Sequence, residues 1–301
     1  MSTVFLVNPA SGNGATGRRW PELARRASAL GLEGDTLLSE RPGHLIALAR
    51  DAVDGGATLV VAVGGDGTLN EVVNGVAGRE VDLATIPLGT GMDFGRTYKI
   101  PTKFDDAVRV ALEGDVRTID AGHVTYRTWA GETAERYFAN VSSVGMSGAV
   151  AQRANGMSKA LGGQVTFFYA LTRVFLEWQN TEVMVQLDDA ERRGRMHDVI
   201  VANGVWHGGG MKLAPDAAPD DGQFDVVLIG DVSKIDFLTT APKIYKGKHV
   251  HHPKVEVLRS KRVEVDAPVQ LPIELEGEQV GTTPATFEVV PGALRVRVPT
   301  A

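Results

Sequence analysis

The chain has 301 residues, a net charge of −6 and an isoelectric point near 5.7. At roughly 150 residues per domain this length suggests two domains, and 43% hydrophobic with 23% charged residues excludes a disordered or fibrous protein. The acidic balance argues against a nucleic-acid partner, which usually requires a basic face, and the absence of cysteine excludes disulfides, zinc–thiolate sites and cysteine nucleophiles.

The N-terminal residues lead directly into a strand-like segment, without the basic start and apolar core of a signal peptide. No apolar run approaches the ~20 residues that a membrane span needs. We therefore expect a cytoplasmic protein whose membrane contact, where there is any, is peripheral.

The first 120 residues alternate apolar runs with amphipathic stretches. The expected strands are residues 3–7, 35–38, 58–63 and 83–87, and the expected helices are residues 18–30, 44–53, 68–76 and 105–113. The run at 58–63 is apolar throughout, which is typical of a parallel strand covered on both faces. This alternation predicts an α/β domain with a parallel sheet.

The pattern changes near residue 117 to short alternating runs bounded by Gly, Pro and Asp. These runs are residues 117–126, 136–145, 182–188, 197–205, 224–230, 255–260, 262–267, 286–291 and 294–299. They predict an antiparallel sandwich or barrel. One helical stretch, at about 166–178, interrupts them, and its apolar stripe either fills the core or lines a ligand pocket.

The most informative segment is Gly64-Gly65-Asp66-Gly67-Thr68, between an apolar strand and a helix. Glycines let the backbone approach a phosphate, and a helix N-terminus offers free N–H groups to it. A carboxylate beside a phosphate makes sense mainly with a bridging divalent cation. The dinucleotide fingerprint and the P-loop are both absent. The alternative to a phosphate-binding loop is a tight strand-to-helix turn capped by Asp66 or Thr68.

Two other loops have the same chemistry. Residues 8–14 (NPASGNG) follow the first strand, and residues 87–94 (PLGTGMDF) follow the fourth. Ligands of open α/β sheets bind at the carboxyl ends of the strands. Three such loops at one edge of the sheet favour a phosphate site over an isolated turn.

At these residues the chain resembles a known family. The segments NPASG, GGDGTLNEVVNG and PLGTGMDFGR resemble the diacylglycerol kinase catalytic domain, found in soluble bacterial lipid kinases and in sphingosine and ceramide kinases. Four segments of the C-terminal part are similar to the bacterial branch: YFANVSSVGMSG, VANGVWHGGGMKLAPDAAPDDGQFDVVLI, YKGKHVHHPKV and IELEGEQVGTTPATFEVVPGALRVRVP. NAD kinases and phosphofructokinase relatives share GGDGT, but the full set in this order is specific to lipid kinases.

The resemblance implies a two-domain fold and the cofactors ATP and Mg²⁺. An α/β nucleotide-binding domain (1–120 plus about 286–301) is followed by an antiparallel β-sandwich for the lipid substrate (121–285), whose last strand returns to the first domain. ATP is expected in the cleft between them. The implied nucleotide-binding residues are Asn8, Ser11, Gly64, Gly65, Asp66, Gly67, Thr68, Thr90 and Glu278, and the implied Mg²⁺ and water network is Asp66, Asp93 and Asp120.

Phosphoryl transfer to an alcohol also needs a base that accepts the hydroxyl proton. Glu276 lies at a turn where the family usually has Asp-Gly-Glu, so the resemblance implies that Glu276 is the base and acts with Asp66 in catalysis. The longer side chain changes the reach of the carboxylate, and a solvated hairpin is the alternative. Met92 replaces the asparagine usual in the family, which predicts altered nucleotide contacts.

Other polar segments have weaker meanings. The acidic loop at 215–224 is either a self-bonded turn or, as in related bacterial enzymes, a structural Mg²⁺ site built from Asp216, Asp220, Asp221 and Gln223. His249, His251 and His252 are expected in a solvated loop, and His207 is a candidate cleft residue.

The resulting hypothesis is an ATP- and Mg²⁺-dependent lipid kinase that converts diacylglycerol to phosphatidic acid. One alternative is a kinase for another acceptor: a sphingosine-like lipid, a phosphatidylglycerol-like lipid or a soluble alcohol. The other is a nucleotide- or lipid-binding protein with little turnover. A basic stripe of Arg18, Arg19, Arg25 and Arg26 either contacts the membrane or is a solvated helix face. Some relatives dimerise through the sandwich, so the resemblance also implies a homodimer as one candidate assembly.

Overall fold

The computed structural model describes residues 2–89, 91–155 and 163–300. Contacts within the chain divide it into two compact units, which we call unit 1 (Met1–Ala121 with Val290–Ala301) and unit 2 (Gly122–Val289). Two strands have residues in both units, β5 (Asp115–Arg127) and β17 (Glu278–Val298).

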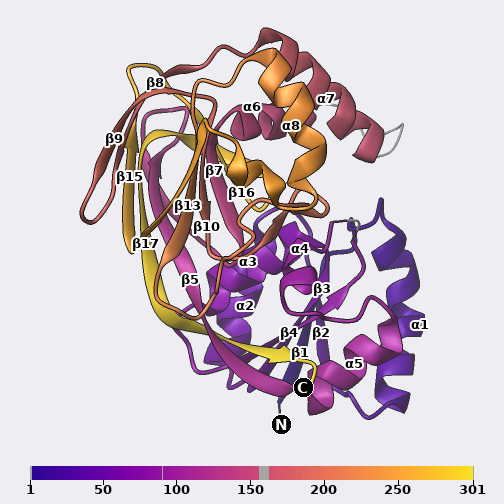
Figure 1. The fold of residues 1–301 in the computed structure, drawn as a ribbon. Helices are drawn as coiled ribbons and strands as arrows, with labels where there is room; N and C mark the ends of the chain where they lie inside the picture. Colours follow the sequence, from indigo (N-terminus) through magenta and orange to yellow (C-terminus); the bar gives the residue numbers. More distant parts are fainter. Residues whose placement is uncertain (1, 90, 156–162, 301) are drawn as a thin grey trace. The chain divides into compact units, whose positions relative to one another are not determined.

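Unit 1 is a parallel sheet with helices on both faces (Figure 1). Its strands are β1 (Thr3–Val7), β2 (Asp35–Leu38), β3 (Leu59–Gly64) and β4 (Asp82–Pro87). Its helices are α1 (Ala15–Ala29), α2 (His44–Asp54), α3 (Asp66–Val76), α4 (Asp93–Thr97) and α5 (Phe104–Glu113). The strand order is β4-β3-β1-β2, and Arg295 and Val296 of β17 pair in parallel beside β4.

Burial on both faces explains why these strands are continuous apolar runs. Successive strand residues point to opposite faces. Phe5 and Val7 pack in one cluster with Trp20 and Leu23 of α1 and with α5, whereas α2 and α3 cover the other face (Figure 1). The carboxyl ends of β1, β3 and β4 therefore stand side by side at one edge of the sheet.

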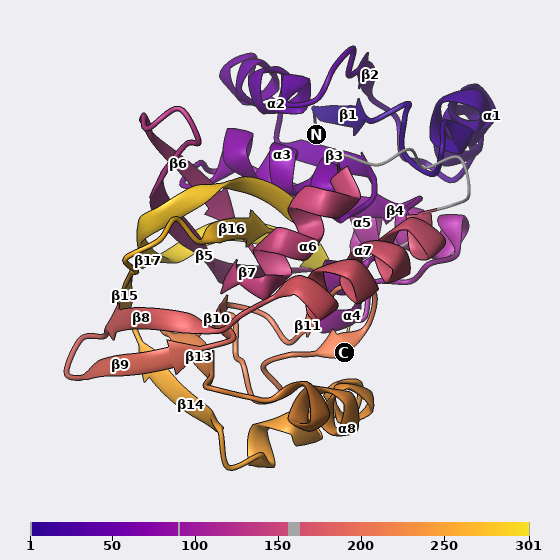
Figure 2. The same ribbon diagram turned by 90° about the horizontal axis from the view of Figure 1, so that it is seen from above.

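Unit 2 is built from antiparallel strands around a second core (Figure 2). Its strands are β6 (Thr133–Phe138), β7 (Val141–Gly145), β8 (Thr181–Gln186), β9 (Glu191–Met196), β10 (Asp198–Ala202), β11 (Trp206–His207), β12 (Met211–Lys212), β13 (Phe224–Ile229), β14 (Val255–Ser260), β15 (Arg262–Asp266) and β16 (Pro272–Leu275). Its helices are α6 (Met146–Asn155), α7 (Gly163–Glu177), α8 (Lys234–Ile244) and the short 3₁₀ helix η2 (Lys248–His251).

The strand pairing forms three branches that meet at β17. One runs β14-β13-β10-β7-β16-β17, and a second continues from β17 through β15 and β8 to β9. The third runs from β17 through β5 to β6. Helix α6 packs against α7, β7 and β16 (Figure 2). The predicted fold class, an α/β domain followed by a β-sandwich whose last strand returns to the first domain, is confirmed.

The structure corrects several expected elements. Residues 136–145 form the separate strands β6 and β7, because the N–H groups of Ala139 and Asn140 donate to a side chain rather than to a neighbouring strand. Residues 286–298 belong to one strand, β17, that continues through Pro291 and Gly292. Helices α4, α6 and α8 and strand β9 do not follow from the hydrophobic pattern.

Candidate functional site

The three loops after β1, β3 and β4 contact one another in unit 1. The Asn8 N–H donates to the carbonyl of Val63 at 3.1 Å. The side-chain amide of Asn8 donates to Oγ1 of Thr68, also at 3.1 Å, and Thr68 is buried. Ser11 is partly exposed in the same first loop, where its N–H donates to the Asn8 carbonyl. The sheet therefore brings together the residues expected to bind phosphate in the first and middle loops.

Glycines allow this close approach. A Cβ atom on Gly89 would overlap the backbone of Gly65, and one on Gly91 would overlap the carboxylate of Asp66. Gly12 has a φ of +59°, and a Cβ there would lie 3.1 Å from the Leu88 carbonyl oxygen. At these positions a larger residue would push the loops apart, so the glycines are required by packing and not only by turn geometry.

Helix α3 begins directly at the middle loop. Its N-cap, Gly65, is extended and provides no side-chain cap, and the half-buried Asp66 is the first helical residue. The N–H groups of the first turn have no partner within the helix and carry a partial positive charge. Gly64 is buried at the end of β3 and Gly67 is partly exposed in the first turn. This arrangement suits an anion that is held by backbone N–H groups.

Asp66 is the central ionisable group of these loops. Its Oδ1 accepts the N–H of Phe94 at 3.3 Å. Burial raises the pKa of Asp66, and the nearby charge of Asp93 raises it further. Asp93 is itself buried and forms an ion pair with Arg96 at 2.5 Å. A divalent cation would relieve the repulsion between the two carboxylates.

The described residues contain no group of three or more histidine or acidic side chains placed to hold a metal ion. Mg²⁺ in kinases is usually bound by one or two carboxylates together with substrate phosphates, so the Asp66–Asp93 pair fits this ion. Asp120 is buried on β5, where its Oδ1 accepts the N–H of Gly292 at 2.8 Å. Thr90 lies outside the described residues.

Met92 immediately precedes α4 and has a left-handed backbone with φ of 56°. Asparagine adopts this conformation more readily than methionine, so the residue usual in the family would suit the backbone better. With Gly64, Asp66 and Phe94, Met92 lines a small cavity of about 10 Å³. The substitution thus lies beside the Asp66 carboxylate.

Glu276 belongs to unit 2, at the turn between β16 and β17. Its Oε1 accepts the N–H groups of Ala139 at 3.0 Å and Asn140 at 2.7 Å. Glu276 and Gly277 both have positive φ, 52° and 88°. Two-residue hairpins with this geometry favour Asp-Gly or Asn-Gly, so glutamate is unusual here. Glu278, two residues further along, is exposed.

A buried network lies next to this turn that the sequence analysis did not predict. Glu274 accepts a hydrogen bond from Ser143 Oγ at 2.7 Å and lies 3.3 Å from Nε2 of His207. Burial by itself raises the pKa of Glu274, but His207, Ser143 and the N–H of Gly277 outweigh it and hold this pKa below its usual range. The sequence feature that could have pointed to this network is the row of glutamates at alternate positions 274, 276 and 278.

The acidic loop at 215–224 makes its own contacts. Asp221 accepts the N–H of Gln223 at 3.1 Å and forms an ion pair with Arg259. Burial raises the pKa of Asp225 on β13 to about 6, with a further contribution from the charge of Asp216. Asp220 is exposed. The like charges of Asp216 and Asp225 are the feature of this loop that a cation would stabilise.

One of the three histidines expected in a solvated loop is buried. His249 lies in the 3₁₀ helix η2, and its Nε2 is 3.0 Å from the Leu213 carbonyl oxygen. His251 is exposed and His252 is partly exposed.

A cavity of about 650 Å³ opens in unit 2 beside α6 and α7. Its lining includes Ala149, Val174, Trp178 and Leu271, with polar side chains such as Arg153 around them. Part of the apolar stripe of α7 therefore lines a cavity, whereas Phe175 packs against α8.

Comparisons with known proteins agree with this arrangement. The model of the diacylglycerol kinase catalytic domain matches residues 2–124, and that of the YegS C-terminal NAD kinase beta sandwich-like domain matches residues 140–298. The chain belongs to the diacylglycerol kinase family. The resemblance seen in the motifs is thereby confirmed across both units.

The similarity to curated relatives covers most of the chain. Diacylglycerol kinases of Staphylococcus carnosus and Staphylococcus saprophyticus are 28% and 26% identical to it, over 94% of this chain and 90% of theirs. The crystal structure of a diacylglycerol kinase from Bacillus anthracis has 18% identity and a TM-score of 0.71, covering 99% of this chain and 96% of that one. This structural likeness shows the shared fold.

Membership of this family makes the chain a lipid kinase, as its motifs predicted. None of the helices in the described part of the chain is long and apolar enough to span a bilayer.

Proposed function

We propose that this lipid kinase transfers the γ-phosphoryl group of ATP to the hydroxyl of diacylglycerol and produces phosphatidic acid. The observation that carries the proposal is the contact of three glycine loops around Asp66 in unit 1. Relatives named diacylglycerol kinase support the choice of acceptor.

In this proposal the loops bind the phosphates of ATP. The backbone of Gly64, Gly65 and Gly67 and the side chains of Asn8, Ser11 and Thr68 form the phosphate site, and Thr90 and Glu278 add contacts to the nucleotide. Asp66 and Asp93 would hold Mg²⁺, and Asp120 would belong to the same network. The ion supplies neutralisation of the phosphate charge. Burial and the charge of Asp93 disfavour the ionised form of Asp66 on its own. A bound cation would stabilise this carboxylate, which suits Asp66 to the role.

Glu276 is proposed as the base that accepts the proton of the acceptor hydroxyl. Its Oε1 accepts two backbone N–H groups, which fixes the position of the carboxylate proposed to accept the proton. The apolar side of the cavity beside α7 is proposed to hold part of an acyl chain. Peripheral attachment to the membrane then brings the acceptor to the protein.

Two accessory sites are also proposed. Asp216, Asp220, Asp221 and Gln223 would hold a structural Mg²⁺ near Asp225, where the fit rests on the like charges of Asp216 and Asp225. In the basic stripe of α1, the charge of Arg26 is neutralised by Asp105 at 2.6 Å, so Arg18 and Arg19 are its better candidates for lipid contact.

The test is transfer of labelled phosphate from ATP to lipid, with Mg²⁺ and a panel of diacylglycerol, sphingosine and phosphatidylglycerol in mixed micelles. Asp66→Asn should lower kcat about 100-fold or more, because it removes the charge that balances the metal and phosphates. Asp35→Asn, an exposed residue of β2, is the matched control and should keep the wild-type rate. Equal rates for Asp66→Asn and wild type would show that these loops are not the phosphate site.

A protein that binds nucleotide with little turnover is the second candidate. It is favoured by the engagement of Glu276 with backbone N–H groups and by the left-handed Met92. Calorimetric binding of ATP without any labelled lipid across the panel would support this candidate over the kinase.

A further inference from the structure

Helix α8 exposes apolar side chains in an unusual way. None of its residues is buried, and Ile235 and Leu238 are 74% and 62% exposed. Tyr245, which follows the helix in a helical conformation, is 57% exposed. At 3.6 residues per turn, residues 235, 238, 242 and 245 form one stripe. Single exposed apolar residues are ordinary, but a contiguous row of them indicates a binding surface.

Helix α7 continues this surface. Lys234 Nζ donates to the carbonyl of Leu176, and the rings of Phe175 and Phe237 stack with centroids 4.7 Å apart. These contacts join the C-terminal end of α7 to the start of α8, and the two helices lie close to each other in Figure 1. Leu176 is 56% exposed at the point of contact. We call Leu176, Ile235, Leu238 and Tyr245 the α8 patch.

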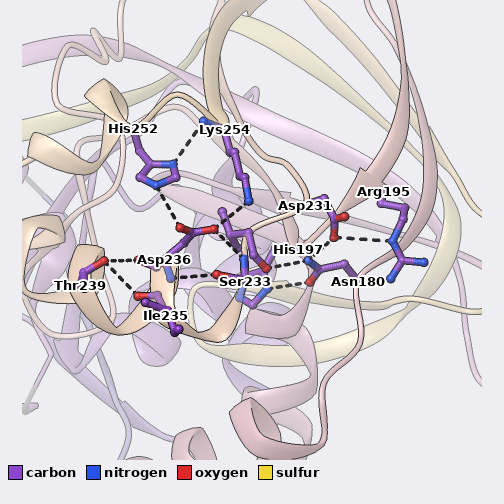
Figure 3. Close-up of polar contacts among 11 residues, drawn as sticks. Asn180, Arg195, His197, Asp231, Ser233, Ile235, Asp236, Thr239, His252 and Lys254 are labelled. Atoms are coloured by element: carbon purple, nitrogen blue, oxygen red, sulfur yellow. Dashed lines mark hydrogen bonds and ion pairs between the residues drawn. The ribbon is translucent and has the colours of Figure 1, made fainter.

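Polar contacts fix the start of α8 (Figure 3). The Ser233 hydroxyl accepts the N–H of Asp236, and the Asp236 carboxylate accepts the N–H of Ser233 at 2.8 Å. Lys254 Nζ also donates to Asp236 at 2.8 Å. Asn180 donates its side-chain amide to Asp231 and to the carbonyl of Val232, immediately before the helix. Because these contacts orient the helix, its apolar stripe stays directed outward.

Positive charge surrounds the patch. Residues 232–255 contain five lysines and one acidic residue, Asp236, although the whole chain has a net charge of −6. Lys243, Lys246 and Lys248 are exposed and form no ion pair with any carboxylate of the described residues. Their charge is therefore available to an anionic partner.

We propose that the α8 patch and its lysines dock this protein onto an anionic lipid bilayer. Lysine stems can lie along apolar surface while their ammonium groups reach headgroups, and tyrosine is favoured at the membrane interface. A second copy of this chain is a poorer occupant, because a two-fold interface would place the same lysines opposite one another. The inference rests on the proposed function, in which the acceptor lies in a membrane.

Sedimentation with vesicles, without nucleotide, tests the surface directly. Wild type should bind vesicles of phosphatidylglycerol and phosphatidylcholine more tightly than vesicles of phosphatidylcholine alone. Leu238→Ser should weaken binding about tenfold, from the lost apolar burial. Lys243→Glu with Lys246→Glu should weaken it more, by at least about fivefold for each lysine replaced, because each substitution reverses a charge.

The matched controls are Leu38→Ser and Lys103→Glu, which change exposed residues of unit 1 and should bind vesicles as wild type does. Melting temperatures of all variants should agree within a few degrees, since the α8 patch is not part of a core. Wild-type binding by Leu238→Ser, or a dimer that this substitution converts to a monomer, would overturn the proposal.

Activity separates this inference from the proposed function. With a short-chain diacylglycerol dispersed in water, the α8 variants should turn over at the wild-type rate, and with vesicles they should be slower. Absence of any lipid product from wild type would contradict the proposed function, whereas patch-dependent vesicle binding would still support the α8 surface.

Discussion

Glu276 is the residue whose role can be decided most sharply. Glutamine at 276 keeps an oxygen that can accept the N–H groups of Ala139 and Asn140, but it cannot accept a proton. Glu276→Gln should therefore keep the wild-type melting temperature while kcat falls about 100-fold, as expected for loss of a general base. Steady-state kinetics and a thermal melt on the same preparation measure both.

Glu276→Asp is the complementary variant. The shorter side chain moves the carboxylate away from the two N–H groups, whereas aspartate suits the positive φ of this turn, so we expect a changed kcat with a melting temperature close to that of wild type. A glutamine variant with full turnover would assign Glu276 a structural role in the turn and would require another base.

At the scale of elements, the contact between the loops after β3 and β4 should control nucleotide use. In Gly89→Ala the new methyl group would meet the backbone of Gly65, which cannot move aside as a flexible side chain would. We expect kcat/KM for ATP to fall about tenfold or more, because small displacements of a phosphate site are costly. Gly55→Ala, at the end of α2 with φ of −77°, is the control. Unchanged kcat/KM in Gly89→Ala would mean that the loops need not touch.

The parallel strands could be predicted because burial on both faces leaves a continuous apolar run, as at 58–63. The meeting of three loops followed from the same reasoning, since parallel strands end at one edge. Helix α8 could not be found by hydrophobic pattern, because Phe237 and Ile244 pack against core clusters while other apolar residues of the helix are exposed. The Ser233–Asp236 capping box was the signal present. The partners of Glu276 are 136 and 137 residues away in the chain, beyond the reach of local reasoning.

At the scale of the whole molecule, buried ionisable groups should make stability depend on pH. Burial raises the pKa of Asp198 on β10 to about 7, although Ser147 donates hydrogen bonds to it. Burial also lowers the pKa of His197 to about 4. The folded protein holds a proton on Asp198 more tightly than the unfolded chain does. The contribution of Asp198 to the free energy of unfolding is therefore fully present below the unfolded pKa of about 3.9 and is lost as pH rises to about 7. His197 acts oppositely, because its unfolded form gains a proton as pH falls below about 6.5.

Asp198→Asn isolates the larger of these effects. The amide oxygen can accept the Ser147 hydrogen bonds, but the residue no longer ionises. Relative to wild type, the variant should gain stability as pH rises from 5 to 7, by up to about 1.4 kcal/mol for each pH unit. The difference should level off above about pH 7, where folded wild type has lost the proton. Urea unfolding at pH 5, 6, 7 and 8 measures it. A difference that stays constant across this range would show that Asp198 is already charged in the folded protein at pH 5.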